Sequence, residues 1–80
     1  MDELTDLERD VLAFEGLWWQ RAGSKEVAMR VRFDLTPTAY YRRVNQLINR
    51  PAALVHAPVV VKRLRRLRDE RARRRHQLAG

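Results

Sequence analysis

The chain has 80 residues, a formal net charge of +7 at pH 7 and no cysteine, so it suits one small domain without disulfides or thiolate metal sites. Its two histidines, His56 and His76, are too far apart in the sequence to form a zinc site on their own. The acidic N-terminal residues are the reverse of a signal peptide, and the longest apolar run, Val59 to Val61, is too short to span a membrane, so we expect a soluble, cytoplasmic protein.

The first predicted helix begins after Thr5 and ends at residues 22–23. Thr5 and Glu8 fit a capping box, in which the two side chains each bind a free backbone N–H group at the helix start. Leu12 and Trp19 fall on a second face, and if that face is exposed it is the natural surface for a homodimer. The main buried stripe is predicted from apolar residues at helical spacing: Leu7, Val11, Phe14 and Trp18.

The second predicted helix is capped by Ser24 and runs from Lys25 to about Phe33. A turn at Asp34 and Leu35 follows, with Asp34 at the position where a helix-turn-helix motif usually has glycine. The buried side of this helix is expected to hold Val27, Ala28, Val31 and Phe33.

The third predicted helix is capped by Thr36 and runs from Pro37 to about Asn49. Proline fits the first helical position because no backbone N–H group is needed there. Two short helices joined by a tight turn, over residues 24–49, are typical of a helix-turn-helix motif. The inner stripe of the third helix is predicted to hold Tyr40, Val44, Leu47 and Ile48.

The last predicted helix opens at Pro58, after a short turn over residues 51–55, and extends to about Arg75 or beyond. Its apolar stripe of Val60, Leu64 and Leu67 continues into arginines, so the helix should leave the hydrophobic body near Leu67. We therefore predict an all-α fold, a small helix-turn-helix bundle of three to four helices with an extended basic C-terminal helix. Residues 1–57 form the core, and residues 58–80 form the basic helix, which packs on the core through residues 60–67.

The third helix has a polar side opposite its inner stripe. In a helix-turn-helix motif the second helix enters the major groove of DNA, where arginine reads guanine and asparagine or glutamine reads adenine. On its own, such a polar side is also typical of any solvated helix. We predict base contacts by Thr38, Arg42, Asn45 and Gln46. Phosphate contacts beside them are predicted for Thr36, Tyr41 and Arg43.

The charges are unevenly distributed along the chain. Residues 1–40 hold 5 Lys/Arg and 8 Asp/Glu, whereas residues 41–80 hold 12 and 2, which indicates a basic arm for a polyanion. Crowded cations repel one another on a helix, and a phosphate backbone would neutralise them. A solubility tail or an RNA-tolerant basic arm is the alternative, and a membrane-surface helix is disfavoured because the distal segment lacks bulky apolar residues. Phosphate contacts are predicted for Lys62, Arg63, Arg65, Arg66, Arg68, Arg71, Arg73, Arg74 and Arg75.

Four groups of residues form a pattern between residue 4 and about residue 75: Phe14-Glu15 with Trp18-Trp19, Ala22-Gly23-x-Lys25-Glu26, Tyr40-Tyr41 with Asn45 and Leu47-Ile48, and Val61-Lys62-Arg63-Leu64-Arg65-Arg66-Leu67-Arg68. The pattern resembles a short actinobacterial and actinobacteriophage helix-turn-helix family of unknown function, similar to a mycobacterial nucleoid-associated DNA-binding protein. The resemblance implies a helix-turn-helix fold, DNA binding and no cofactor. The sequence departs from the pattern at Ala57, where an acidic cap is expected before Pro58.

Two functions are open at this point. The first is a DNA-binding protein, either nucleoid-associated or a transcriptional regulator, with double-stranded DNA as its partner. The second is a phage or bacterial protein-interaction module that binds and inhibits a host protein, for which an exposed Leu12 and Trp19 flank would be the indication. An enzyme is not expected, because the sequence offers no nucleophile–base set and no metal cluster.

Overall fold

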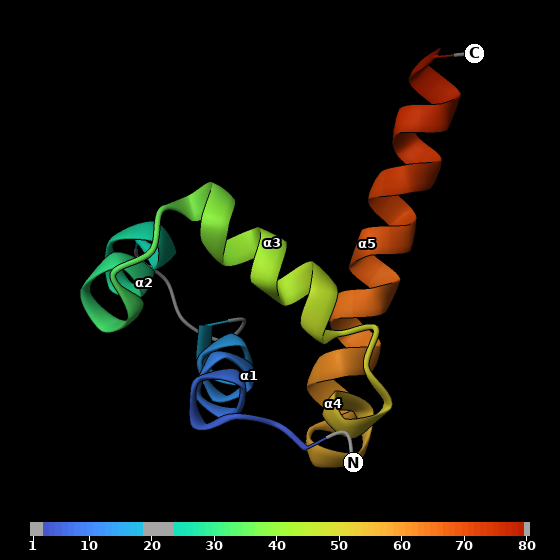
Figure 1. Ribbon diagram of the computed structural model, residues 1–80. Helices are drawn as coiled ribbons and strands as arrows, with labels where there is room; N and C mark the ends of the chain where they lie inside the picture. The colour runs from blue at the N-terminus through green and yellow to red at the C-terminus, as the bar shows by residue number, and fades with distance from the viewer. Residues whose placement is uncertain (1–2, 19–23, 80) are drawn as a thin grey trace.

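The computed structural model describes residues 3–18 and 24–79, and within these ranges it contains five α-helices and no strand. Figure 1 shows α3 crossing above α1 from α2 to α5, and α5 rising beyond the rest of the molecule as a long arm. The all-α fold with an extended C-terminal helix is thus confirmed. In chain order the helices are α1 (Asp6–Trp18), α2 (Lys25–Phe33), α3 (Pro37–Leu47), α4 (Pro51–His56) and α5 (Pro58–Ala79).

Side-chain caps set the starts of the first three helices, as the sequence predicts. The Thr5 N–H group donates to Glu8 Oε1 at 2.8 Å, and the Glu8 N–H group donates to Thr5 Oγ1 at 3.1 Å. The hydroxyls of Ser24 and Thr36 each accept a hydrogen bond from the backbone N–H group three residues later. The predicted end of the first helix at residues 22–23 lies outside the described residues.

The turn between α2 and α3 depends on Asp34, whose backbone is left-handed, with φ 53° and ψ 41°. The Asp34 N–H group donates to the Arg30 carbonyl at 2.9 Å, which closes the last turn of α2. Aspartate tolerates this conformation better than most residues, because its short polar side chain hydrogen-bonds locally. The turn is therefore made without the glycine that is usual in this motif.

The core forms where α1, α2 and α3 meet. The ring of Phe14 lies edge-on to the rings of Phe33 and Tyr40, with centroids 5.3 and 5.8 Å apart. Ala53 of α4 and Val61 of α5 complete the core from the other side. The predicted inner stripe of α3 is confirmed, since all four of its residues are buried.

The prediction for the buried side of α2 was wrong for its valines. Val31 is 82% exposed and Val27 is also exposed, whereas Met29 is fully buried and Phe33 packs against the core. Met29 and Phe33 are four residues apart and share a side of the helix. In a helix of only nine residues these two longer side chains reach the core, and the valines are left on the opposite side.

The face of α1 also differs from the prediction in part. Val11 and Phe14 are buried and Trp18 packs against the core, but Leu7 is 37% exposed at the edge of the molecule. Leu12, expected on a second face, is 1% exposed. The buried surface of α1 is wider than one stripe, because α5 covers this helix in addition to α2 and α3.

Residues 51–56, predicted as a turn, form the short helix α4. Arg50 is extended, with φ −85° and ψ 133°, and Pro51 then occupies the first helical turn, where its missing N–H group costs nothing. The helix ends at Ala57, which precedes Pro58 and is therefore held out of the α region. Two prolines thus separate three helical segments, and α3 ends at Leu47 rather than near Asn49.

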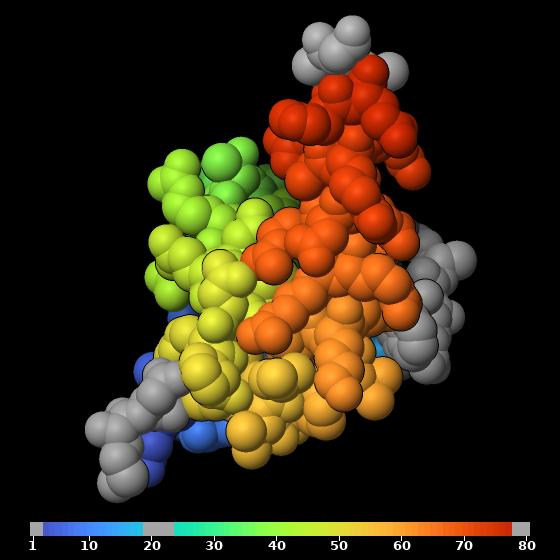
Figure 2. Space-filling model, turned by 90° about the vertical axis from the view of Figure 1, so that its right-hand side faces the viewer, coloured from blue at the N-terminus to red at the C-terminus, as the bar shows by residue number. Residues whose placement is uncertain are grey.

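The basic helix α5 packs on the body through its first turns only. Val61 is fully buried, and Val60 lies close to Gly16 of α1, where an added Cβ would be 3.3 Å from Val60 Cγ2. Leu64 packs against the core, and residues 71–77 are exposed. Figure 2 shows the last turns of α5 standing clear of the other helices. No helix in the described ranges is both long enough and apolar enough to cross a membrane.

Candidate nucleic-acid interface

The polar side of α3 is open to solvent. Thr38, Arg42, Asn45 and Gln46 are all exposed, and with Tyr41 and Asn49 they line one shallow hollow on the surface. The four side chains predicted to contact bases therefore lie together on one surface. This arrangement follows from the helical period, because the buried stripe that begins at Tyr40 leaves these positions on the opposite side of the helix.

A buried ionic group connects α3 to α1 and α2. Glu15 of α1 is 2% exposed, and its carboxylate accepts hydrogen bonds from the Tyr40 hydroxyl and from Lys25 Nζ, the latter at 2.8 Å from Oε2. Burial, and then the hydrogen bond to Glu15, raise the pKa of the Tyr40 phenol far above its ordinary value. The Lys25 ammonium also lies over the Tyr41 ring, at 5.3 Å from its centroid. Three helices are thereby joined at one carboxylate.

Sequence reasoning missed this group, although a signal for it was present. Glu15 follows Val11 by four residues, so it lies on the same buried side of α1. A carboxylate at such a position needs a cation or hydroxyl partner. Tyr40, already assigned to the inner stripe of α3, was available to supply the hydroxyl.

The predicted phosphate contacts on α3 do not all lie on one side. Thr36 is exposed, and its hydroxyl is engaged in the cap of α3. Tyr41 is half-buried beside the hollow described above, whereas Arg43 lies across the helix, in a hollow shared with Leu7 and Gln46. Arg43 and Tyr41 therefore flank the polar side of α3 at its two edges.

Three of the predicted phosphate contacts on α5 bind carbonyl oxygens of the protein itself. Arg63 donates to the Glu15 carbonyl at 3.2 Å, Arg65 donates to the Ile48 carbonyl at 2.5 Å, and Arg68 donates to Asn49 Oδ1 at 2.6 Å. Carbonyls near helix C-termini lack intrahelical partners, so these arginines tie α5 to the ends of α1 and α3. Burial lowers the pKa of the Arg63 guanidinium, and the charge of Glu15 opposes that effect.

A cleft separates α3 from α5 above these contacts. Its lining is mixed: Val44, Leu64 and Leu67 are apolar, Glu15 and Lys25 form the buried ionic group, and Asn45, Arg68 and Arg71 are polar or charged. Figure 1 shows the two helices close together at the C-terminal end of α3 and diverging from there. The polar side of α3 and the basic arm therefore face a common space.

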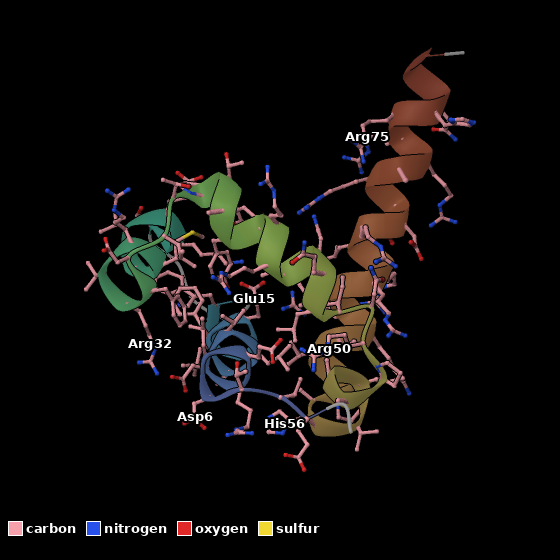
Figure 3. The ribbon with its side chains drawn as sticks, viewed as in Figure 1. Asp6, Glu15, Arg32, Arg50, His56 and Arg75 are labelled. Atoms are coloured by element: carbon pink, nitrogen blue, oxygen red, sulfur yellow. The ribbon has the colours of Figure 1, made fainter. Side chains whose placement is uncertain are left out.

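Cations outnumber carboxylates around this cleft, where Glu15 is the one lining carboxylate among the described residues. Between Asp34 and Asp69 the chain contains no Asp or Glu and eight Lys or Arg. Asp6 lies on the far side of α1 from α3 (Figure 3). Asp6 is therefore kept apart from the cations of α3 and α5, whereas Glu8 lines a hollow with Arg43 and Gln46.

The expectation of a homodimer face at Leu12 and Trp19 is corrected in part. Leu12 belongs to the core and offers no surface to a partner, because α5 covers the second face of α1. Trp19 lies outside the described residues. The apolar flank that would have indicated a protein-interaction module is therefore not available at Leu12.

Comparisons with known proteins give one family. Residues 3–76 match the model of a family described as a protein of unknown function, DUF3263. No curated protein and no solved structure matches the chain. Because the match covers far more than half of the 80 residues, the chain belongs to the DUF3263 family.

Proposed function

We propose that this protein binds double-stranded DNA through its helix-turn-helix motif, with α3 in the major groove and α5 on the phosphates. The main support is that the exposed polar side of α3, which carries no carboxylate, adjoins a helix with nine Lys or Arg and two acidic residues. Such a surface attracts a polyanion, and α3 adds groups that can read base edges.

The dimensions and chemistry of α3 suit this role. A helix of 11 residues is about 16 Å long, and the major groove of B-DNA, about 12 Å wide, admits an α-helix. Arg42 can bind guanine with two hydrogen bonds, and Asn45 and Gln46 can do the same with adenine. The positive end of the helix dipole at the start of α3 favours a phosphate nearby.

The basic surface of α5 is more extensive than the base-reading surface of α3. This difference favours an architectural, nucleoid-associated protein over a regulator of a single site. Four exposed side chains of α3 are candidates for reading bases, whereas exposed cations continue along α5 well beyond the body. Phosphate contacts strengthen binding to every sequence equally. We therefore expect a large salt dependence and a modest preference between sequences.

The test is a fluorescence-anisotropy titration of labelled DNA duplexes at two salt concentrations. Wild type should bind with a steep salt slope, and truncation after Leu67 should weaken binding to all sequences and flatten that slope. Arg42→Ala should weaken binding to the preferred duplex about 5- to 150-fold, as for loss of a base contact of about 1–3 kcal/mol. The matched control is Arg32→Ala, which removes the same charge from an exposed side of α2 that points away from α3 (Figure 3).

An RNA duplex of the same sequence distinguishes DNA from structured RNA. The major groove of A-form RNA is deep and narrow, so α3 could not enter it, and binding should be weaker. The proposal fails if wild type does not bind duplex DNA in dilute buffer, or if Arg42→Ala and Arg32→Ala have equal effects. Absence of DNA binding would instead favour the protein-interaction module, for which the exposed Val27 and Val31 on α2 would be the surface to test.

A further inference from the structure

The cations of α5 lie on two sides of the helix, and the two sides have different neighbours. Arg68 and Arg71 line the cleft with Leu64 and Leu67. Arg75 follows Arg71 by four residues and so lies on the same side, and its side chain points toward the side where α3 lies (Figure 3). On the other side, a shallow hollow is lined by Lys62, Arg65, Arg66, Asp69 and Arg73.

Neither acidic residue of α5 is among the residues that line the cleft. Asp69 lines the outer hollow. In the cleft the one lining carboxylate is Glu15, which is already bound by Lys25 and Tyr40. On the cleft side of α5, Arg71 is therefore exposed with no carboxylate of α5 lining the cleft beside it, whereas Asp69 partly neutralises the outer side and also lies 3.5 Å from Arg68 Nε.

The spacing of the cleft-side arginines fits one strand of a duplex. Arg68 and Arg75 are seven residues apart, or about 10 Å along the helix axis. Three guanidinium groups over that length can contact successive phosphates of one strand. The opposite wall of the cleft presents Asn45 of α3, on the side of that helix expected to face the bases.

We propose that the cleft between α3 and α5 holds one phosphodiester strand of the duplex, the strand that borders the groove entered by α3. Arg68, Arg71 and Arg75 bind its phosphates. Arg66 and Arg73, which the sequence alone suggested as phosphate contacts, lie on the outer side of α5 and stay in solvent. This inference rests on the proposed DNA binding and adds to it which strand and which face of the arm are used. It predicts that the position of an arginine on α5, in addition to the number of arginines, determines affinity.

The test compares two double variants with equal charge loss on the same helix, Arg71→Gln/Arg75→Gln and Arg66→Gln/Arg73→Gln. All four residues are exposed, and Arg68 is retained so that its hydrogen bond to Asn49 is undisturbed. The cleft-side variant should bind duplex DNA at least 10-fold more weakly, with a log–log salt slope lower by about 1.8, or two contacts at about 0.9 each. The outer variant should change affinity by less than about 3-fold and leave the slope unaltered.

Equal losses in the two variants would overturn the cleft as a strand site while leaving DNA binding intact, and no binding by wild type would overturn the proposed function itself. Far-UV circular dichroism checks that both variants keep their helix content. If either variant is poorly folded, NMR signals of the arginine Nε–H groups in the wild-type protein decide the question. Addition of duplex should then shift Arg71 and Arg75 and leave Arg66 and Arg73 in place, and the reverse pattern contradicts the proposal.

Discussion

Replacing Tyr40 by phenylalanine isolates one hydrogen bond in the centre of the fold. The phenol is fully buried and donates to Glu15, while its ring packs against Phe14, Phe33 and Tyr41. Phenylalanine keeps the ring contacts and removes only the hydroxyl. The change therefore reports on the bond to the buried carboxylate and on little else.

The expected loss of stability in Tyr40→Phe depends on the hydrogen-bond partners that Glu15 retains. A hydrogen bond to a charged group is worth about 1.5–3 kcal/mol, and Glu15 keeps Lys25 as a partner, at 2.8 Å. We therefore expect Tyr40→Phe to lower the free energy of unfolding by about 2 kcal/mol. In a domain of this size a loss of 2 kcal/mol lowers Tm by about 8–16 °C. Urea denaturation followed by circular dichroism measures the first quantity, and a thermal melt measures the second.

The pH dependence provides a second readout of the same bond. Burial and the hydrogen bond to Glu15 raise the pKa of Tyr40 in the folded state, whereas the phenol of the unfolded chain ionises near pH 10. The stabilisation is therefore complete below about pH 10 and is lost as the pH rises above it, by about 1.4 kcal/mol per pH unit. Tyr40→Phe should lack this contribution.

Tyr41→Phe is the matched control, because Tyr41 is half-buried and its hydroxyl has no hydrogen bond within the described residues. It should change the free energy of unfolding by less than about 0.5 kcal/mol. If Tyr40→Phe were as stable as Tyr41→Phe, with the same decline above pH 10 as wild type, the reasoning about the buried carboxylate would be refuted.

Three further predictions concern single sites, each measured by urea denaturation. Thr5→Ala should cost about 1 kcal/mol by removing the capping box of α1, and no loss would mean that the cap is not formed in solution. Asp34→Gly should be more stable than Asp34→Ala by about 1 kcal/mol, because the left-handed backbone there favours glycine, and the opposite order would exclude that conformation. Val31→Ser should change stability by less than about 0.5 kcal/mol, whereas Met29→Ala should cost about 2–5 kcal/mol. If Val31→Ser cost more stability than Met29→Ala, the side of α2 that carries Val31 would be the buried one, as the sequence predicted.

Local signals in the sequence predicted most of the fold. The caps at Ser24 and Thr36 and the proline after Thr36 act within one helical turn, so the boundaries of α2 and the start of α3 could be predicted from neighbouring residues. The inner stripe of α3 could be predicted because four apolar residues recur at helical spacing with no competing apolar side.

The errors arose where several helices compete for one surface. In α2 the valines and the pair Met29 and Phe33 lie on different sides, and only the positions of α1 and α3 decide which side is buried. Which arginines of α5 bind carbonyl oxygens also depends on how the helices are arranged. Arg63 and Arg65 resemble their neighbours in sequence, but in the described part of α5 they and Arg68 are the arginines that donate to carbonyl or amide oxygens on α1 and beyond α3.

These internal arginine bonds bear on how a non-binding variant should be engineered. Neutralising every cation of α5 would also release the helix from the two others it fastens, so a loss of binding could reflect a collapsed scaffold instead of a missing contact. An informative charge-depleted protein keeps Arg63, Arg65 and Arg68 and alters only cations further along the arm. Some arginines of α5 thus stabilise the fold, and others are candidate ligand contacts. A reagent that modifies every guanidinium group would affect both sets, so its effect on binding could not be assigned to either.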